Sequence, residues 1–207
     1  MLEHLKWRYA TKKFDTAKKV SASDLETLKE AVSLTASSLG LQAYKILNIE
    51  NKEIREKLKA ASWNQPQITD ASNLFVFCAF ADVTDKYIDE FIALNAKTRN
   101  QKPEELEKFS NSLKKDMNTR PAEAKKAWLA RQPYIALGNL MTTAASMKID
   151  VCPMEGFDAA KYSEILGLEE KGLVPVCIGA VGYRSPEDKT QHMPKVRKDI
   201  NNLFETI

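Results

Sequence analysis

The stretch Pro153-Met154-Glu155-Gly156-Phe157-Asp158 decides how this chain folds around one tight turn. Residues 149–152, just before it, form an apolar run that predicts a β-strand. Asp158 is a favourable N-cap, because its carboxylate can accept a hydrogen bond from the first turn of a helix predicted over residues 159–166. The stretch therefore predicts a strand that ends in two successive backbone N–H groups and leads directly into a helix.

Three more apolar runs predict strands, at residues 44–49, 74–80 and 174–181. The run at 74–80 is continuously apolar, which is typical of a central strand covered on both faces. Between residues 84 and 147 the pattern is helical, so the strands are unevenly spaced along the chain. This arrangement favours an α+β layered domain, a single unit over residues 1–207, rather than a regular doubly wound sheet.

A few residues predict where helices begin and break. Ser23-Asp24-Leu25-Glu26 matches a capping box, which predicts a helix from Ser23 to about Ala36. Pro103 and Pro121 are expected in the first turns of new helices, where a missing N–H group costs nothing. Pro133 lies inside a helical pattern and is expected to kink or divide the helix, because proline cannot donate the backbone hydrogen bond.

The composition is that of a globular protein with one core, since 43% of the 207 residues are hydrophobic and 29% are charged. The 31 basic and 28 acidic residues are mixed along the chain, so the net charge of +3 forms no basic patch for nucleic acid. No apolar run approaches the ~20 residues of a membrane span, and the first residues lack the apolar core of a secretion signal. We therefore expect no nucleic-acid or membrane partner.

The three cysteines, Cys78, Cys152 and Cys177, each lie in an apolar, strand-like stretch. Their odd number and wide spacing argue against a disulfide framework and against a zinc site. With only His4 and His192 in the chain, a histidine-based metal centre is not expected either. Reduced core thiols are typical of a cytoplasmic protein, and we expect that location.

The common nucleotide-binding and hydrolase motifs are missing. Gly179 and Gly182 give only G-x-x-G inside a strand, not the G-x-G-x-x-G of a dinucleotide-binding fold, and no P-loop is present. Neither a G-x-S-x-G elbow nor a Cys–His pair supports nucleophilic hydrolysis. Any chemistry is therefore expected to come from a bound organic cofactor that the protein positions.

Two basic strings lie near opposite ends of the chain, Arg8-Tyr9-Ala10-Thr11-Lys12-Lys13-Phe14 and Pro194-Lys195-Val196-Arg197. Each spaces its cations so that side chains can converge on one phosphate, with Arg as a planar fork of donors and Lys as a point charge. They can close around one ligand only if the fold brings the two ends together. For either string alone, the alternative is a solvated basic segment.

Flavin mononucleotide (FMN) would need cations at its phosphate, a cation and amides at its pyrimidine edge, a backbone donor at its central nitrogen and apolar cover for its ring. Candidates for the phosphate and the pyrimidine edge are Arg8, Lys195 and Arg197, with Lys12, Asn64 and Gln67. Candidates for ring cover and backbone donors are Pro153, Met154, Glu155 and Gly156.

Five motifs in this order resemble those of the flavin-dependent nitroreductase family. They are Arg8-x-x-x-Lys12-x-Phe14-Asp15, Ala36-Ser37-Ser38-x-Gly40-x-Gln42, Asn64 upstream of Asp70-Ala71-Ser72, the stretch from Pro153 to Asp158, and Pro194-Lys195-x-Arg197. The resemblance covers nearly the whole chain and is nearest to the oxygen-insensitive nitroreductase and dihydropteridine reductase-like branch.

This resemblance implies a nitroreductase-like fold, in which helices flank a central mixed, mostly antiparallel sheet, and an intertwined homodimer. FMN would bind in two sites at the subunit interface. Beyond the contacts already named, the resemblance adds backbone groups at the phosphate and a loop from the partner subunit. These further residues are Tyr9 and Ala10, and Ser37, Ser38 and Gly40.

The implied activity is a ping-pong oxidoreduction. NADH or NADPH would donate hydride to FMN, and a nitroaromatic, quinone or related small acceptor would then take two electrons. No side chain would be catalytic in its own right, and Lys12 would tune the ring electrostatically. The alternatives are a flavin-binding or sensor protein without significant turnover, or a specialised role such as dihydropteridine or enoyl reduction.

At two of the predicted site residues, the chain differs from the pattern of the family. Ala10 stands where many members carry serine, and Gln67 where many carry lysine. A neutral residue at 67 weakens the positive field beside the ring, which predicts a lower flavin redox potential. Residues 82–131, which shape the substrate roof in the family, match poorly. Three aromatic residues there either line the roof or pack in the core: Phe91, Phe109 and Trp128.

Overall fold

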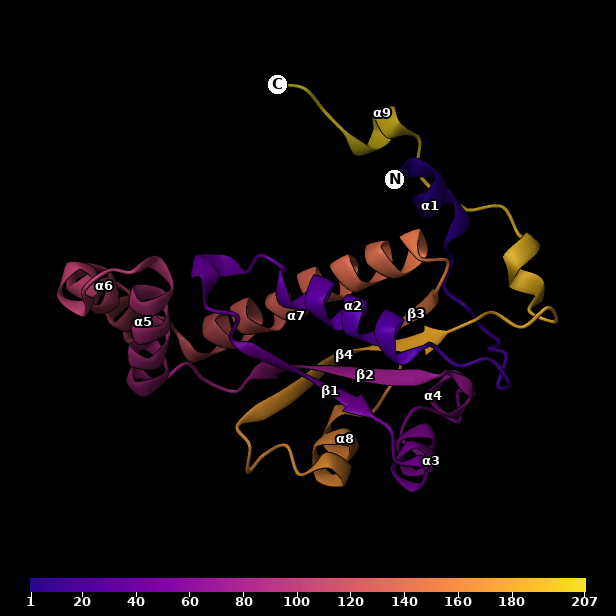
Figure 1. Cartoon of the computed structure of the whole chain (residues 1–207), viewed down its shortest axis with the longest axis horizontal. Helices are drawn as coiled ribbons and strands as arrows, with labels where there is room; N and C mark the ends of the chain where they lie inside the picture. The colour runs from indigo at the N-terminus through magenta and orange to yellow at the C-terminus, as the bar shows by residue number, and fades with distance from the viewer.

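A four-stranded antiparallel sheet forms the centre of the molecule (Figure 1). The structure is a computed structural model and describes all 207 residues. The strands lie in the order β1-β2-β4-β3, so β1 and β3 are the edges. Their bounds are β1 Tyr44–Ile49, β2 Asn73–Phe80, β3 Asp150–Met154 and β4 Leu173–Gly182. All four predicted strands are therefore present, and the α+β class is confirmed.

Strand β2 is the buried central strand that its sequence predicted. It pairs with β1 on one side and with β4 on the other, and all of its residues except Phe80 are buried. Because side chains alternate between the two faces of a strand, Leu74 and Val76 enter one core cluster while Phe75 and Phe77 enter another. The continuous apolar run thus serves two cores at once.

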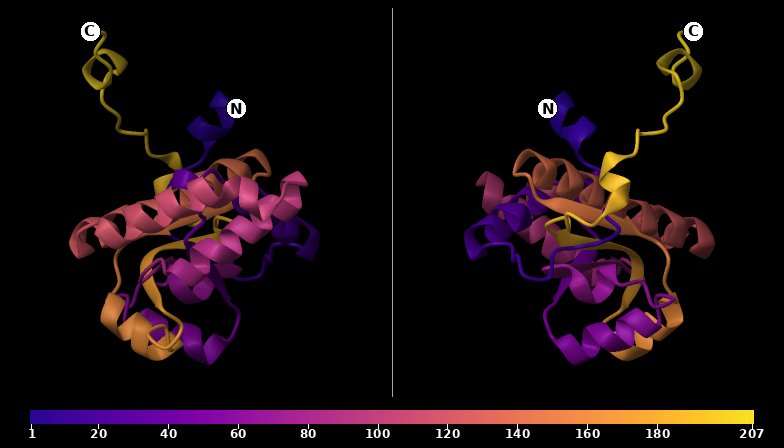
Figure 2. Two further views of the ribbon diagram at one scale, coloured as in Figure 1. Left: turned by 90° about the vertical axis from the view of Figure 1, so that its left-hand side faces the viewer. Right: turned by 90° about the vertical axis from the view of Figure 1, so that its right-hand side faces the viewer.

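Helices cover both faces of the sheet (Figures 1 and 2). One face carries α2 (Ala22–Ser33) and the long helix α7 (Ala122–Ser146), and the other carries α3 (Lys52–Ala60), the short α4 (Gln67–Asp70) and α8 (Ala159–Leu166). Asp158 caps α8 as predicted, because its Oδ1 accepts a hydrogen bond from the Lys161 N–H at 3.1 Å. None of the helices combines the length and the apolar character that crossing a bilayer requires.

A third core cluster lies at the far end of the molecule from the chain termini (Figure 1). It joins α5 (Asp85–Arg99), the 3₁₀ turn η2 (Pro103–Leu106) and α6 (Glu107–Thr119) to the start of α7. The rings of Phe91 and Phe109 meet edge to face at 6.4 Å between centroids. These aromatic residues therefore pack against each other, which favours the core interpretation over a substrate roof.

The prediction that Pro133 divides a helix is wrong. Helix α7 runs without interruption over 25 residues with Pro133 buried inside it. Proline removes one backbone donor, the one that would bond the carbonyl of Leu129. Packing of Leu137 and Leu140 against the sheet outweighs that loss, since both side chains are buried in the core.

The capping-box prediction is also wrong, by two residues. Helix α2 begins at Ala22, and its N-cap is Ser21, whose Oγ accepts a hydrogen bond from the Asp24 N–H at 3.1 Å. Ser21 also donates its hydroxyl to the Asp24 carboxylate, so this pair satisfies the helix start in place of Ser23 and Glu26. The helix ends at Ser33 instead of about residue 36.

Pro103 starts η2 as predicted, whereas Pro121 is the N-cap residue of α7 rather than a first-turn residue.

The two ends of the chain lie on the same side of the molecule, over the outer helix layer (Figure 2). Helix α1 (Leu2–Trp7) precedes the first basic string, and the chain after β4 passes through η3 (Lys189–His192) toward α9 (Ile200–Leu203). Lys195 Nζ donates a hydrogen bond to the carbonyl of Lys6, and the Ser185 N–H donates to the carbonyl of Lys13 at 2.9 Å. The expectation that the fold brings the two basic strings together is confirmed.

Candidate functional site

Three cations from the two ends of the chain meet without a carboxylate between them. Arg8 is the C-cap residue of α1, while Lys195 and Arg197 follow η3. Burial lowers the pKa of Arg8, and the positive charge of Arg197 lowers it further. Partial burial, followed by the charges of Arg8 and Arg197, likewise lowers the pKa of Lys195. Cations that repel one another in this way form a site that an anion would stabilise.

Asp188 holds the first basic string in place. Its buried carboxylate accepts hydrogen bonds from the Tyr9 hydroxyl at 2.8 Å and from the N–H groups of Lys12 and Lys13 at 2.8 and 3.1 Å. Burial alone would raise the pKa of Asp188, but hydrogen bonds from Thr190, Lys13, Lys12 and Tyr9 together lower it to about 2. The carboxylate therefore stays charged and fixes the backbone that carries Arg8 and Lys12.

Sequence reasoning missed Asp188, because its partners lie about 180 residues away along the chain. A weak local signal was present, since Asp188 also caps η3 by accepting from the Thr190 N–H at 3.0 Å. Sequence reasoning also missed Arg184, whose guanidinium forms an ion pair with the buried Asp150 at 2.6 Å. That guanidinium lies 4.0 Å from the centroid of the Trp7 ring and 4.5 Å from that of Tyr9. Arg184 thereby ties the start of β3 to the N-terminal segment.

A cavity of about 420 Å³ adjoins this cation cluster. Predicted residues Pro153, Met154 and Glu155 line one side, and residues of α7 together with Cys177 of β4 line the other. The Arg8 Nη2 donates to the sulfur of Met141, a residue of the cavity wall, at 3.5 Å. Arg8 therefore connects the cation cluster to the wall of the cavity.

The turn after β3 presents the two backbone donors that the sequence predicted. Neither the Glu155 N–H nor the Gly156 N–H donates a hydrogen bond within the chain. Pro153 can sit in β3 because β3 is an edge strand, where a missing donor does not break the sheet. The turn therefore ends the sheet with unused hydrogen-bonding capacity beside the cavity.

Two buried polar atoms at this end of the sheet lack a partner. Gln67 is 95% buried, yet its Oε1 makes no hydrogen bond, and neither does the Oγ1 of the fully buried Thr11. Burial raises the pKa of the Cys152 thiol, whereas nearby Lys12 and Gln67 act to lower it, which places these three side chains close together. Orphaned buried polar atoms of this kind call for a ligand.

Asn64 lies on a strained, exposed turn at the same end. Trp63 and Asn64 both have left-handed backbone conformations, with φ of 51° and 58°. Such conformations cost energy for residues other than glycine and cluster at binding sites. Together with the unpaired cations and the free N–H groups, this donor set fits the phosphate, the pyrimidine edge and the central nitrogen of FMN.

The loop of Ser37, Ser38 and Gly40 is attached elsewhere. The Ser38 N–H donates to Gln132 Oε1 at 2.8 Å, and the Trp128 indole N–H donates to Ser38 Oγ at 3.1 Å. No hydrogen bond joins this loop to the cation cluster of the same chain. Its place in the FMN site therefore stays a prediction that depends on a second subunit.

The comparisons with known proteins bear on this fold and this site together. The family model described as "Nitroreductase family" matches residues 5–183. The chain belongs to the nitroreductase family. It is 38% identical over 209 residues to a provisionally named NAD(P)H nitroreductase, SH0546, of Staphylococcus haemolyticus (strain JCSC1435), covering 97% of this chain and 94% of the relative.

Solved structures of nitroreductases show the same fold. The provisionally named nitroreductase ydfN of Bacillus subtilis superposes with a TM-score of 0.89 at 20% identity, covering 100% of this chain and 98% of its own. A provisionally named nitroreductase of Exiguobacterium sibiricum, solved in complex with FMN, has a TM-score of 0.84 at 23% identity and covers 100% and 96%. The predicted resemblance and the predicted nitroreductase-like fold are both confirmed.

Proposed function

We propose that this nitroreductase is an FMN-dependent NAD(P)H oxidoreductase that passes two electrons to nitroaromatic, quinone or related small acceptors in a ping-pong sequence. The observation that carries the proposal is the meeting of unpaired Arg8, Lys195 and Arg197 beside a cavity that ends in free backbone N–H groups. The names of the relatives and the FMN in one solved structure support it. When bound, FMN supplies the hydride chemistry.

The residues of the chain bind and orient the cofactor. Arg8, Lys195 and Arg197 hold the phosphate, with the backbone of Tyr9 and Ala10 alongside. Lys12 places a positive charge at the pyrimidine edge, where the buried amides of Gln67 and the exposed Asn64 complete the contacts. Pro153 and Met154 cover the ring, while the N–H groups of Glu155 and Gly156 donate to its central nitrogen.

The thiol that lines the cavity is not activated for covalent catalysis. Burial raises the pKa of the Cys177 thiol to about 12, and it does the same for Cys78. A thiol that stays protonated at neutral pH is a poor nucleophile. The acceptor therefore reacts at the ring and not on the protein, and the chain contributes position, charge and apolar walls.

A homodimer completes the proposal, because the chain leaves two apolar surfaces uncovered. Residues 194–207, here called the C-terminal arm, extend away from the body (Figures 1 and 2). Their apolar side chains are at least 64% exposed: Met193 beside the arm, and Val196, Ile200, Leu203, Phe204 and Ile207 within it. Exposed apolar side chains that gather on one segment mark an interaction surface.

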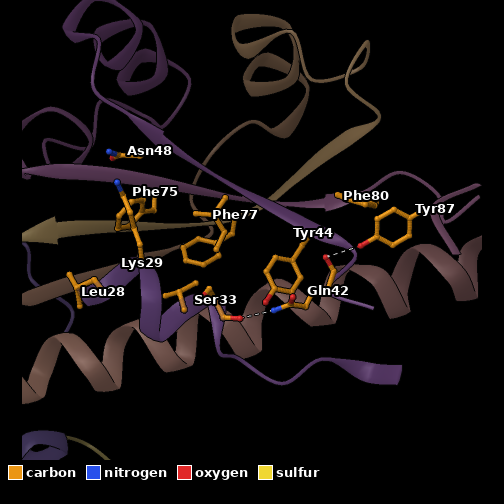
Figure 3. A pocket seen from close by; sticks show the side chains of 12 residues that line it. Leu28, Lys29, Ser33, Gln42, Tyr44, Asn48, Phe75, Phe77, Phe80 and Tyr87 are labelled. Atoms are coloured by element: carbon orange, nitrogen blue, oxygen red, sulfur yellow. Dashed lines mark hydrogen bonds between the residues drawn. The ribbon is translucent and has the colours of Figure 1, made fainter. Parts of the chain in front are cut away.

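The second surface is a groove of about 460 Å³ between α2 and the edge strand β1 (Figure 3). Tyr44, Phe75 and Phe77 form its floor, and the Tyr44 hydroxyl has no hydrogen-bond partner. Lys29 on its rim forms an ion pair with Glu26 of the same helix at 2.7 Å, and Glu205 of the arm could share this cation. We propose that the arm of each subunit fills the groove of the other, which also delivers the Ser37–Gly40 loop to the partner's site.

Reconstitution with FMN tests the activity. Purified protein loaded with FMN is mixed anaerobically with NADH or NADPH in a stopped-flow instrument and then with nitroaromatic and quinone acceptors. Rapid bleaching at the flavin band, followed by reoxidation, is the expected result. A bound flavin that neither nicotinamide bleaches would instead indicate the sensor alternative, and a protein that binds no FMN would refute the proposal.

Light scattering after size exclusion tests the dimer. We expect the mass of two chains for the wild type and of one chain for Phe204→Asp, because the variant would bury a carboxylate against the aromatic side chains of the groove. Val174→Asp, which changes a half-exposed apolar residue of β4 away from arm and groove, is the matched control and should stay dimeric. A monomeric wild type contradicts the arrangement.

A further inference from the structure

The turn after β3 is held from two opposite sides by side chains that sequence analysis did not identify. Tyr134 on α7 donates its hydroxyl to Glu155 Oε1 at 2.7 Å. Gln65, in the turn before α4, donates its Nε2 to the carbonyl of Gly156 at 2.8 Å and to that of Ser62 at 3.1 Å. Two consecutive residues of the turn are thus each fixed by a different element of the fold.

The contact of Gln65 with the turn leaves no room for a side chain at 156. A Cβ atom placed on Gly156 would lie 2.8 Å from Gln65 Nε2 and 3.3 Å from the ring of Trp63. Glycine therefore serves the close approach of Gln65 here and not a left-handed backbone, since Gly156 is not among the residues with positive φ. Any larger residue would displace Gln65 from the carbonyl.

Tyr134 lies at the wall of the cavity, not in a core. It is 40% exposed and lines the same 420 Å³ cavity as Glu155 and Pro153. Burial, and then its hydrogen bond to Glu155, raise the pKa of the Tyr134 hydroxyl, so it remains a proton donor at neutral pH. Removing that hydroxyl would therefore alter the cavity while leaving the packing of α7 intact.

We propose that Tyr134 and Gln65 are positioning residues, which fix the Glu155–Gly156 turn so that its two free N–H groups keep the direction a bound FMN ring needs. This rests on the proposed function. A peptide with an unpaired N–H group rotates easily toward water, and donors stabilise charge on a cofactor only when they are held in advance. Tyr134 acts through the Glu155 side chain, and Gln65 acts through the Gly156 carbonyl.

The test compares Tyr134→Phe, Glu155→Ala and the double variant. FMN affinity is measured by quenching of flavin fluorescence, and the midpoint potential of bound FMN by spectroelectrochemistry. Tyr134→Phe should weaken FMN binding by about three- to tenfold, the scale of one net hydrogen bond, and lower the potential. In the Glu155→Ala background the same change should have no further effect, because Tyr134 acts only through that carboxylate.

Two more variants separate positioning from mere stability. Glu155→Gln keeps an oxygen that accepts from Tyr134, so it should bind FMN within about twofold of the wild type, unlike Glu155→Ala. Tyr183→Phe removes a hydroxyl that makes no hydrogen bond and should change neither affinity nor potential. Thermal midpoints of the FMN-free variants should match that of the wild type.

The measurements distinguish failure of the positioning role from failure of the proposed function. Additive effects of Tyr134→Phe and Glu155→Ala, or an unchanged potential in Tyr134→Phe, would overturn the positioning role while leaving the proposed function intact. A wild-type protein that binds no FMN would overturn both. If Tyr134→Phe does not fold, the comparison of Glu155→Gln with Glu155→Ala still decides the matter.

Discussion

Arg55 and Arg8 show two opposite ways of burying a guanidinium. Arg55, on α3, is only 7% exposed, and its donors reach the carbonyls of Ile68, Ala71 and Ser72 at 2.7, 2.6 and 3.3 Å. Arg8 reaches only the sulfur of Met141 and faces other cations. The donors of Arg55 are used by the fold, whereas those of Arg8 are left for a ligand. The difference separates a cation whose donors the fold uses from a cation for which we propose a ligand.

The largest expected effect is on stability, at Arg55. Replacing it with Met leaves three carbonyls without donors and should lower the free energy of unfolding by about 3–5 kcal/mol. Urea unfolding at pH 7 measures this loss. Lys57→Met, on the exposed side of the same helix, should cost less than about 0.5 kcal/mol. A similar small cost at Arg55 would remove the distinction between the two arginines.

Arg8 should show the reverse behaviour. Arg8→Ala relieves repulsion among the cations, so the stability of the FMN-free protein should stay within about 0.5 kcal/mol of the wild type. Its affinity for FMN should fall about 10- to 100-fold, as expected for a lost charge-assisted hydrogen bond. Fluorescence titration measures the affinity, with the exposed Lys126→Ala as control. Unchanged FMN affinity would show that Arg8 does not bind the phosphate.

Asp188 should link the cation site to pH. Its pKa is about 2 in the folded protein, against about 3.9 for an unperturbed aspartate. A lowered pKa stabilises the folded state above the unfolded value, and this contribution of about 2 kcal/mol is lost as the pH falls from about 4 through 2. Urea midpoints of Asp188→Asn should therefore lie below those of the wild type at pH 7 and converge with them toward pH 2. Curves that stay parallel over this range would exclude the linkage.

The smallest effect is expected at Gln67, where the site lacks a cation. Gln67→Lys should raise the midpoint potential of bound FMN, because a positive charge stabilises the anionic reduced ring. Without FMN, the charge should destabilise the fold, because residue 67 is buried and the new cation would repel Lys12. Spectroelectrochemistry against the wild type tests the first part. A potential that stays level or falls would contradict the assigned place of residue 67.

The sequence predicted the features that depend on neighbours along the chain. The strand, turn and helix around Pro153–Asp158 follow from an apolar run and a capping aspartate, and the structure contains all three. The start of α2 was predicted wrongly, because Ser21, two residues before the expected Ser23, caps the helix through the Asp24 N–H. The prediction that Pro133 divides a helix was also wrong, because tertiary packing of α7 outweighs the missing backbone N–H group of the proline.

The residues that hold the site together could not be predicted from the sequence. Asp188 bonds to residues 175 or more positions away, and Tyr134 and Gln65 lie 21 and 91 positions from the turn they hold. Periodicity and capping rules describe only contacts within a few residues, so no pattern marks these pairs. The local sequence therefore determined which residues carry charge and where a strand ends in free N–H groups. Their convergence into one site came from long-range packing, because only the folded sheet brings the two ends and the β3 turn within hydrogen-bonding distance of their supports.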